Sequence, residues 1–137
     1  MKFLVIGGNA AGMSAASRVK RKSPDTEVVV LEQTHEVSYG ACGLPYYVAG
    51  LNNNLDLMRI RKADQFLANG VDLRLGCDVT GADFTAKTVS YTDEKGEAHV
   101  ESYDKLLIAT GSSPKVPPIP GIRQKNIFPL KTLDQAA

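Results

Sequence analysis

The sequence contains no tryptophan, and only two cysteines and two histidines in 137 residues. Two cysteines cannot form a disulfide framework, so Cys42 and Cys77 are expected to be free thiols. His35 and His99 lack the ligand spacing of a zinc site, and we expect no metal. The sequence also has no large excess of charge of either sign, because its 16 basic and 15 acidic residues give a net charge of +1. This balance excludes a strongly basic nucleic-acid binder and an acidic disordered segment.

Long hydrophobic runs are absent as well. The longest ones, residues 3–6 and 28–31, are far shorter than the roughly 18 residues that a membrane span needs. No signal-peptide pattern precedes them. We therefore expect a soluble, cytoplasmic protein that binds neither membrane nor nucleic acid. The length falls within the usual range of a single domain.

Residues 2–32 have the pattern of a strand, a helix and a second strand. Residues 2–6 are an apolar run that stops at two glycines, which is typical of a strand buried on both faces of a parallel sheet. Residues 11–22 place small side chains on one stripe of a helix. Residues 27–32 predict a second buried strand with an acid at its carboxyl end. These elements fit within about thirty residues and predict a βαβ unit of an α/β fold.

The rest of the chain is less regular. Residues 34–50 are a glycine-rich and aromatic stretch with at most a short helix. We expect a helix over 61–69 that ends at Gly70, and an extended segment over 71–75. Antiparallel strands around a turn (79–103), a buried strand (105–109) and a proline-rich extended linker (114–121) follow.

The first candidate site is the segment Gly7-Gly8-Asn9-Ala10-Ala11-Gly12, where the first strand turns into the first helix. Free N–H groups and the positive end of the helix dipole can hold a dinucleotide pyrophosphate there if no side chain blocks its approach. Asn9 departs from the usual G-x-G-x-x-G pattern, although asparagine tolerates unusual dihedral angles. Glu32 follows about twenty residues later and is placed to accept hydrogen bonds from a ribose, which favours an adenosine with a free 2′-hydroxyl. The alternative is a tight turn without a ligand.

The second candidate is Cys42, in the segment Ser38-Tyr39-Gly40-Ala41-Cys42-Gly43-Leu44-Pro45. A thiol reacts as its thiolate, which the start of a helix and a polar cofactor both favour, and the flanking glycines let a reactant approach. The alternative is a small buried hydrophobe, which is also our interpretation of Cys77. No C-x-x-C pair is present, so a redox mechanism here must use a single thiol.

Both segments, and a third one over residues 106–114 (Leu-Leu-Ile-Ala-Thr-Gly-Ser-Ser-Pro), occur in the order seen in the pyridine nucleotide-disulfide oxidoreductases. The chain resembles the single-cysteine branch of that family, which includes coenzyme A-disulfide reductase, NADH oxidase and NADH peroxidase. The resemblance implies a Rossmann-like FAD-binding domain with a parallel sheet and a small antiparallel hairpin or meander, incomplete at the carboxyl end. Residues 1–113 would form the first part of this domain. Residues 114–137 would be a linker and crossover toward an absent NAD(P)H domain.

The resemblance also implies a role for individual residues. FAD would lay its pyrophosphate over the glycine loop and its ribose at Glu32, while Cys42 would lie against the isoalloxazine ring as nucleophile and redox centre. The backbone of Val79 would meet the adenine. The implied cofactor contacts are Gly7, Gly8, Asn9, Ala10, Ala11, Gly12, Glu32, Gln33, Val79, Ala109, Thr110 and Gly111.

Further positions match residues that contact coenzyme A in the resembled reductases. Guanidinium groups three residues apart share a helix face and can clamp phosphates. A solvated basic turn that complements the helix dipole is the alternative. The matching residues are Ser14, Arg18, Arg21 and Ser38, with Arg61 as an additional phosphate contact.

In the resembled enzymes NAD(P)H reduces FAD, and the electron pair passes to the cysteine, which resolves a disulfide. The implied substrate is coenzyme A disulfide or a related small disulfide or persulfide. Ala10 stands where the oxidases and peroxidases carry a histidine, which disfavours histidine-assisted peroxide chemistry. An NADH oxidase, a plain NAD-binding domain and a non-catalytic nucleotide-binding or assembly module are the alternatives. An uncovered sheet edge predicts self-association, such as a homodimer.

Overall fold

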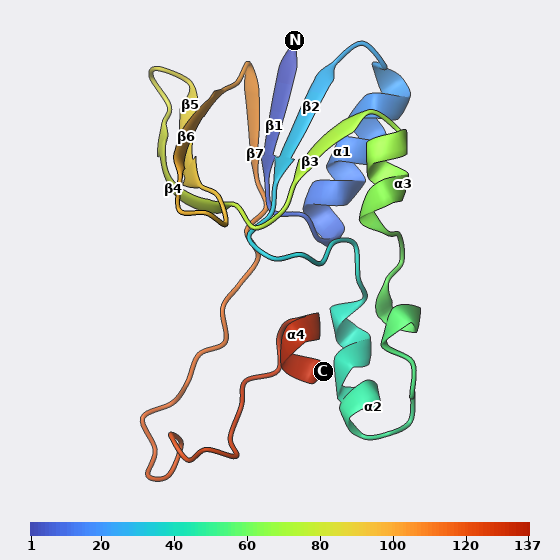
Figure 1. Cartoon of the computed structure of the whole chain (residues 1–137), viewed down its shortest axis with the longest axis vertical. Helices are drawn as coiled ribbons and strands as arrows, with labels where there is room; N and C mark the ends of the chain where they lie inside the picture. The colour runs from blue at the N-terminus through green and yellow to red at the C-terminus, as the bar shows by residue number, and fades with distance from the viewer. The chain divides into compact units, whose positions relative to one another are not determined.

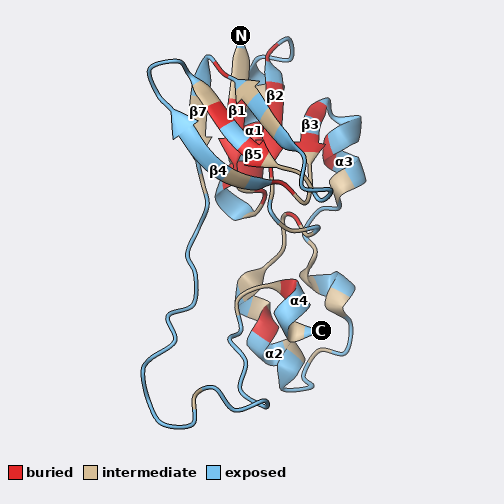
Figure 2. Ribbon diagram, turned by 60° about the vertical axis from the view of Figure 1, so that its left-hand side comes forward, coloured by how far each residue is buried: buried red, intermediate tan, exposed pale blue.

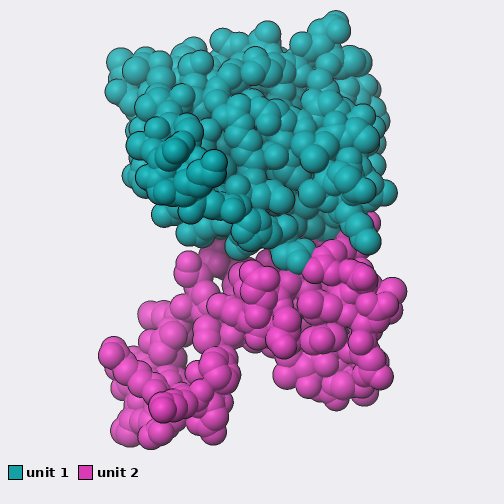
Figure 3. All heavy atoms as spheres, in the orientation of Figure 1, with its two compact units in different colours: residues 1–38, 61–110 teal, residues 39–60, 111–137 magenta.

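The computed structural model describes residues 1–137, and the contacts within it divide the chain into two compact units. Unit 1 comprises residues 1–38 and 61–110, and unit 2 comprises residues 39–60 and 111–137 (Figure 3). None of the helices has the length and apolar character that a membrane span requires.

A parallel four-stranded sheet with the order β3-β2-β1-β7 forms the centre of unit 1 (Figure 1). Its strands are β1 (Lys2–Ile6), β2 (Glu27–Leu31), β3 (Val71–Arg74) and β7 (Lys105–Ile108). Val28, Val29 and Val30 of β2 are at most 1% exposed. The β-branched run therefore forms a strand that is covered on both faces, as its composition predicts. The expected α/β fold and the buried strands β1 and β2 are confirmed. The expectation of a buried strand over 105–109 is wrong, because β7 lies at the edge of the sheet and Ile108 is 55% exposed.

Helices α1 (Ala10–Lys22) and α3 (Ala63–Ala68) cover one face of this sheet (Figure 1). Met13 and Ala16 of α1 and Phe66 of α3 pack there against Val5 and other strand residues. Side chains alternate along a strand, so Leu4 and Ile6 point to the opposite face. Figure 2 shows that the buried residues of unit 1 gather on these strands and on the helix faces that meet them.

A second, antiparallel sheet of unit 1 covers the other face. It has the order β4-β5-β6, with β4 (Asp78–Asp83), β5 (Thr88–Thr92) and β6 (Ala98–Ser102). Val89 and Tyr91 of β5 are buried against β1 and β2, whereas Ser90 between them is exposed. This alternation is typical of an antiparallel sheet with one solvated face. The antiparallel segment expected over 79–103 is confirmed.

Unit 2 has short helices and one isolated antiparallel bridge, between Tyr39 and Arg59. The helices are η1 (Ala41–Gly43), α2 (Leu44–Val48), η2 (Leu55–Met58) and α4 (Leu133–Ala136). Leu44 of α2 and Leu133 of α4 are buried where these two helices meet. The short helix expected within 34–50 is confirmed, and residues 111–119 have no regular structure, as the prolines predict.

A charged network joins the two sheets of unit 1 at Glu101, whose side chain is 13% exposed. Lys2 donates a hydrogen bond to one carboxylate oxygen, and Arg74 donates to the other at 2.6 Å. Arg74 also donates to the Tyr91 hydroxyl at 2.9 Å. Burial alone disfavours the charged carboxylate, but the hydrogen bonds from Lys2 and Arg74 outweigh it and hold the pKa of Glu101 below its usual value.

Glu101→Gln is expected to lower the free energy of unfolding by about 2 kcal/mol at neutral pH, because two cations lose their buried partner. The pKa of Glu101 is lower in the folded chain than in the unfolded chain. Its contribution is therefore complete above the unfolded pKa and is lost as the pH falls through the lower pKa of the folded chain. Urea unfolding at several pH values measures both effects.

Glu27→Gln is the matched control for this experiment. Glu27 pairs with the same Lys2 at 3.1 Å, but its side chain is 58% exposed. Water screens such a pair, so the control is expected to lose no more than about 0.5 kcal/mol. Equal losses in the two variants would show that burial of Glu101 has no energetic role.

Candidate functional site

The glycine loop connects the end of β1 at Ile6 to the start of α1 at Ala10. Gly7 has a φ of +107°, a conformation that L side chains rarely adopt. A Cβ at this position would overlap the carbonyl oxygen of Ala109, and a Cβ at Gly12 would overlap the carbonyl oxygen of Gly7. Glycine at both positions therefore lets β1, α1 and the end of β7 approach closely.

Asn9 directly precedes α1 and has a φ of −101°. This is ordinary backbone, so the departure from glycine at this position introduces no left-handed strain. No acidic side chain occupies the first turn of α1. The N–H groups and the positive dipole end of this 13-residue helix are thus compatible with a bound anion.

A cavity of about 240 Å³ lies beside this loop, at the carboxyl ends of β1 and β2. Segments far apart in the sequence meet around it, because the carboxyl ends of parallel strands share one edge of the sheet. Five of the residues with a predicted cofactor contact are among its lining. The lining residues are Ile6, Gly7, Leu31, Glu32, Gln33, Cys77, Asp78, Val79 and Thr110.

Glu32 is half-buried at this cavity and its carboxylate is held by the protein. One oxygen accepts a hydrogen bond from the Gly8 N–H at 2.5 Å, and the other accepts from the N–H and the hydroxyl of Thr34, both at 2.8 Å. A carboxylate has about four lone-pair sites, so acceptor capacity remains for ribose hydroxyls. Gln33 donates to Asp78 at 3.0 Å across the same cavity.

The other residues of unit 1 with a predicted cofactor contact, and Ser38, lie around the loop. Ala109 follows β7, and its N–H donates to the Ile6 carbonyl at 2.8 Å. Its carbonyl stands beside Gly7, and Thr110 lines the cavity. Ser38 has a φ of +50°, and its N–H donates to the Gly8 carbonyl at 3.0 Å. Gly111 belongs to unit 2.

A second cavity of about 240 Å³ opens between α1 and α3. It brings together Arg21 and Arg61, which are far apart in the sequence. Lys20 lies with them and donates to the carbonyls of Pro24 at 2.7 Å and Thr26 at 3.0 Å. The residues around this cavity are Ser17, Lys20, Arg21, Arg61, Phe66, Asn69 and Val71.

Three cationic side chains and no carboxylate thus line the second cavity, which suits a phosphate-bearing ligand. Ser14 and Arg18 are exposed on α1, and neither they nor Ser38 are among the lining residues. Sequence reasoning missed Ser17, Lys20 and Asn69. Ser17 and Lys20 lie four and one residues before Arg21, a spacing that places Ser17 on the face of Arg21. Asn69 had no such signal.

The two thiols differ in their surroundings. Cys42 lies on η1 of unit 2 and is exposed, so it is not the small buried residue of the alternative interpretation. Gly43, the next residue, packs so closely on Met58 that a Cβ at Gly43 would overlap the Met58 sulfur. Cys77 is 5% exposed in unit 1, as expected, and burial raises the pKa of its thiol. Cys77 therefore stays protonated at neutral pH.

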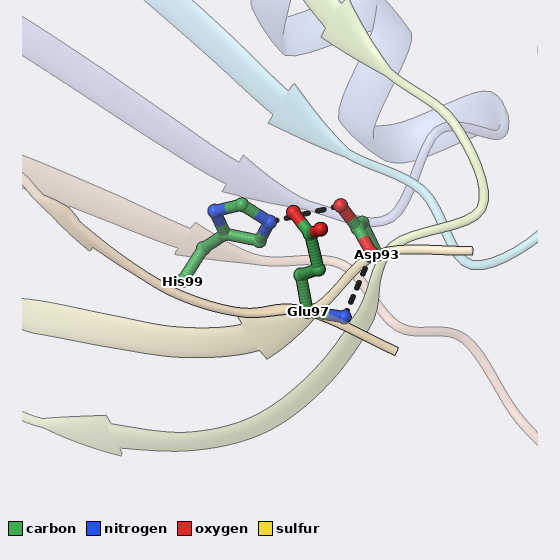
Figure 4. Close-up of side chains that lie close together, drawn as sticks. All are labelled: Asp93, Glu97 and His99. Carbon is green, nitrogen blue, oxygen red and sulfur yellow. Dashed lines mark hydrogen bonds and ion pairs between the residues drawn. The ribbon is translucent and has the colours of Figure 1, made fainter. Parts of the chain in front are cut away.

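Three further titratable side chains of unit 1 gather after β5 (Figure 4). Asp93 accepts hydrogen bonds from the N–H groups of Lys95 and Glu97, each at 2.9 Å, and lies 2.9 Å from a ring nitrogen of His99. The hydrogen bond with His99 lowers the pKa of Asp93. These contacts hold the turn between β5 and β6.

Comparison with known proteins gives the same family over the whole chain. The model of the pyridine nucleotide-disulphide oxidoreductase family matches residues 1–137. An NAD(P)H coenzyme A polysulfide/persulfide reductase from Pyrococcus horikoshii is 42% identical over 93% of this chain, and the match covers 28% of that protein. An NADH oxidase from Lactococcus lactis is 34% identical over 98% of this chain, and the match covers 30% of that protein.

Solved structures agree with these sequence matches. A NAD-dependent persulfide reductase from A. fulgidus superimposes with a TM-score of 0.93 and 38% identity, over 99% of this chain and 26% of that one. The reduced CoADR-RHD of Bacillus anthracis has a TM-score of 0.93 and 30% identity, over 98% of this chain and 25% of that one. The chain therefore spans only 25% to 30% of the proteins named here.

Proposed function

Because the chain belongs to the pyridine nucleotide-disulphide oxidoreductase family, we propose that it forms the FAD-binding portion of an NAD(P)H-dependent reductase of coenzyme A disulfide, or of a related small disulfide or persulfide, with Cys42 as the redox thiol. The observation that carries the proposal is the cavity at the glycine loop, where Glu32, Val79 and Thr110 meet beside Gly7. This arrangement suits an adenine nucleotide, and the exposed Cys42 supplies the thiol chemistry.

Membership of the family implies FAD, with NAD(P)H as co-substrate. The residues of unit 1 fit the adenosine diphosphate half of FAD. The N-terminus of α1 has no acidic side chain in its first turn and can hold a pyrophosphate, and Glu32 lies at the cavity with acceptor capacity left. When bound, FAD supplies the transfer of an electron pair between the nicotinamide and the thiol.

Cys42 performs the disulfide chemistry in this proposal. Its thiolate attacks one sulfur of the substrate, the substrate S–S bond breaks, and one thiolate leaves while Cys42 remains in a mixed disulfide. Two electrons that originate from NAD(P)H then cleave this mixed disulfide and restore the Cys42 thiolate. The sum is NAD(P)H, one proton and one disulfide giving NAD(P)⁺ and two thiols. Exposure of Cys42 is what gives a dissolved disulfide access to the sulfur.

The second cavity favours coenzyme A over an uncharged disulfide. Coenzyme A carries several phosphate charges, and Lys20, Arg21 and Arg61 line that cavity without a compensating carboxylate. The relative from Pyrococcus horikoshii is named for coenzyme A polysulfide or persulfide reduction. This match supports the reductase as the first choice.

NADH oxidase is the second candidate, since relatives at 34% identity carry that name. The full-length enzyme distinguishes the two activities in a sealed cuvette under nitrogen. Consumption of NADH after addition of coenzyme A disulfide supports the reductase. NADH consumption that requires oxygen and does not depend on coenzyme A disulfide supports the oxidase instead.

Arg21→Ala is expected to weaken coenzyme A binding about tenfold, because one charge-assisted contact to phosphate is lost. Isothermal titration calorimetry on the full-length enzyme measures the dissociation constant. Lys22→Ala is the matched control, since Lys22 lies in the same exposed turn but does not line the cavity. If both variants weaken binding equally, general attraction by the basic turn explains the effect and the cavity does not.

A further inference from the structure

Phe66 on α3 is a residue of the second cavity that sequence reasoning did not single out. Its side chain is 2% exposed and belongs to the core cluster between the sheet and the helices. The guanidinium carbon of Arg61 lies 5.1 Å from the centroid of the Phe66 ring, within the range of a cation–π interaction. Both residues line the same cavity. The buried ring thus contacts an exposed cation that faces a ligand-sized space.

No charged group of opposite sign fixes the orientation of Arg61. It is exposed and makes no ion pair with a carboxylate. Lys20 and Arg21 line the same cavity, and their like charge repels the guanidinium. Without another attraction, a long arginine side chain turns into solvent, where repulsion is screened and more rotamers are accessible. The negative face of the Phe66 ring supplies the attraction that opposes this.

We propose that Phe66 is a positioning residue that holds the Arg61 guanidinium in the second cavity, ready for a phosphate-bearing ligand. The choice of coenzyme A as that ligand rests on the proposed function. Phe66 is already fixed by its core packing, so Arg61 loses little further freedom when the anion arrives. The affinity for phosphate therefore depends on a buried side chain that itself carries no charge.

Calorimetric titration of coenzyme A into four forms of the full-length enzyme tests the proposal. The forms are the wild type, Phe66→Leu, Arg61→Ala and the double variant. Phe66→Leu is expected to raise the dissociation constant about three- to tenfold, and Arg61→Ala to raise it at least as much. In the Arg61→Ala background, Phe66→Leu should add less than about twofold, because it acts through the guanidinium. Loss of core packing alone would weaken binding equally in both backgrounds, and this result would overturn the proposal.

Two further measurements keep the test independent of the substrate. In proton NMR spectra without ligand, the Arg61 side-chain methylene next to the guanidinium should show a ring-current shift that disappears in Phe66→Leu. Absence of that shift from the wild type overturns the proposal.

Titrations of the same four forms with inorganic pyrophosphate show whether the cavity binds phosphates at all. If pyrophosphate binds with the expected coupling and coenzyme A does not bind, the choice of coenzyme A fails and the role of Phe66 stands. If neither binds, the proposed role of Phe66 is wrong. The thiol chemistry of Cys42 is tested separately, by the Cys42→Ser variant.

Discussion

Replacing Cys42 with serine in the full-length enzyme is expected to lower disulfide-dependent NADH oxidation by about a thousandfold or more. A serine hydroxyl stays protonated at neutral pH and cannot form the mixed disulfide on which the proposed reaction depends. Cys42 is exposed on η1, so the substitution removes little packing and the fold should be retained. The loss of activity would therefore report on chemistry.

Three measurements separate this outcome from a loss of structure. Flavin absorbance of the purified variant should equal that of the wild type, and the urea midpoint should change little. Iodoacetamide followed by mass spectrometry should label Cys42 in the native wild type and spare the buried Cys77. Disulfide reduction that persists in the Cys42→Ser variant would contradict the assignment of the redox thiol.

The strands and the glycine loop could be predicted because each depends on a local physical requirement. A strand covered on both faces must be apolar over its whole length, and Val28, Val29 and Val30 meet that requirement. A sharp turn from a strand into a helix needs glycine at Gly7, which has a positive φ. Such requirements leave their trace in consecutive residues, so they are visible before the chain is folded.

The second cavity and the Glu101 network do not follow from such local requirements, and only the family resemblance pointed to Arg21 and Arg61 as phosphate contacts. Arg61 meets Arg21 only because α1 and α3 cover the same face of the sheet. Lys2 meets Glu101 because two sheets pack against each other. In each case the partners are far apart in the sequence, and neither residue alone differs from an ordinary surface charge. Helix α4 was missed for another reason, since four residues are too few for a helical period to show.

The two cysteines show how context separates identical residues. The sequence around Cys42 contains glycines and predicts an approachable thiol, and the structure places that thiol on an exposed turn. Cys77 follows Gly76 at the edge of the first cavity, where burial raises the pKa of its thiol. Neighbouring residues indicate accessibility, whereas burial depends on β4 and β5 folding over the sheet.

Gly12→Ala is expected to lower the free energy of unfolding by about 3 kcal/mol or more and to abolish flavin retention. The added Cβ would overlap the carbonyl oxygen of Gly7 and lie 3.1 Å from a methyl group of Val5. The first of these is a backbone atom in a tight turn, so it cannot rotate away as a side chain can. Relief of the overlap must move α1 away from β1, which also moves the helix N-terminus away from the proposed pyrophosphate site.

Gly81→Ala is the matched control, because Gly81 lies in β4 of the same unit and nothing stands within 4 Å of a Cβ built there. Its effect on unfolding should stay within about 1 kcal/mol, and flavin should remain bound. Urea unfolding gives the stabilities, and the absorbance of flavin after gel filtration gives its retention. A Gly12→Ala variant as stable and as yellow as Gly81→Ala would mean that β1 and α1 do not approach as described. Loss of flavin with normal stability would instead place Gly12 in direct contact with the cofactor, so the two readouts separate packing of the loop from binding at it.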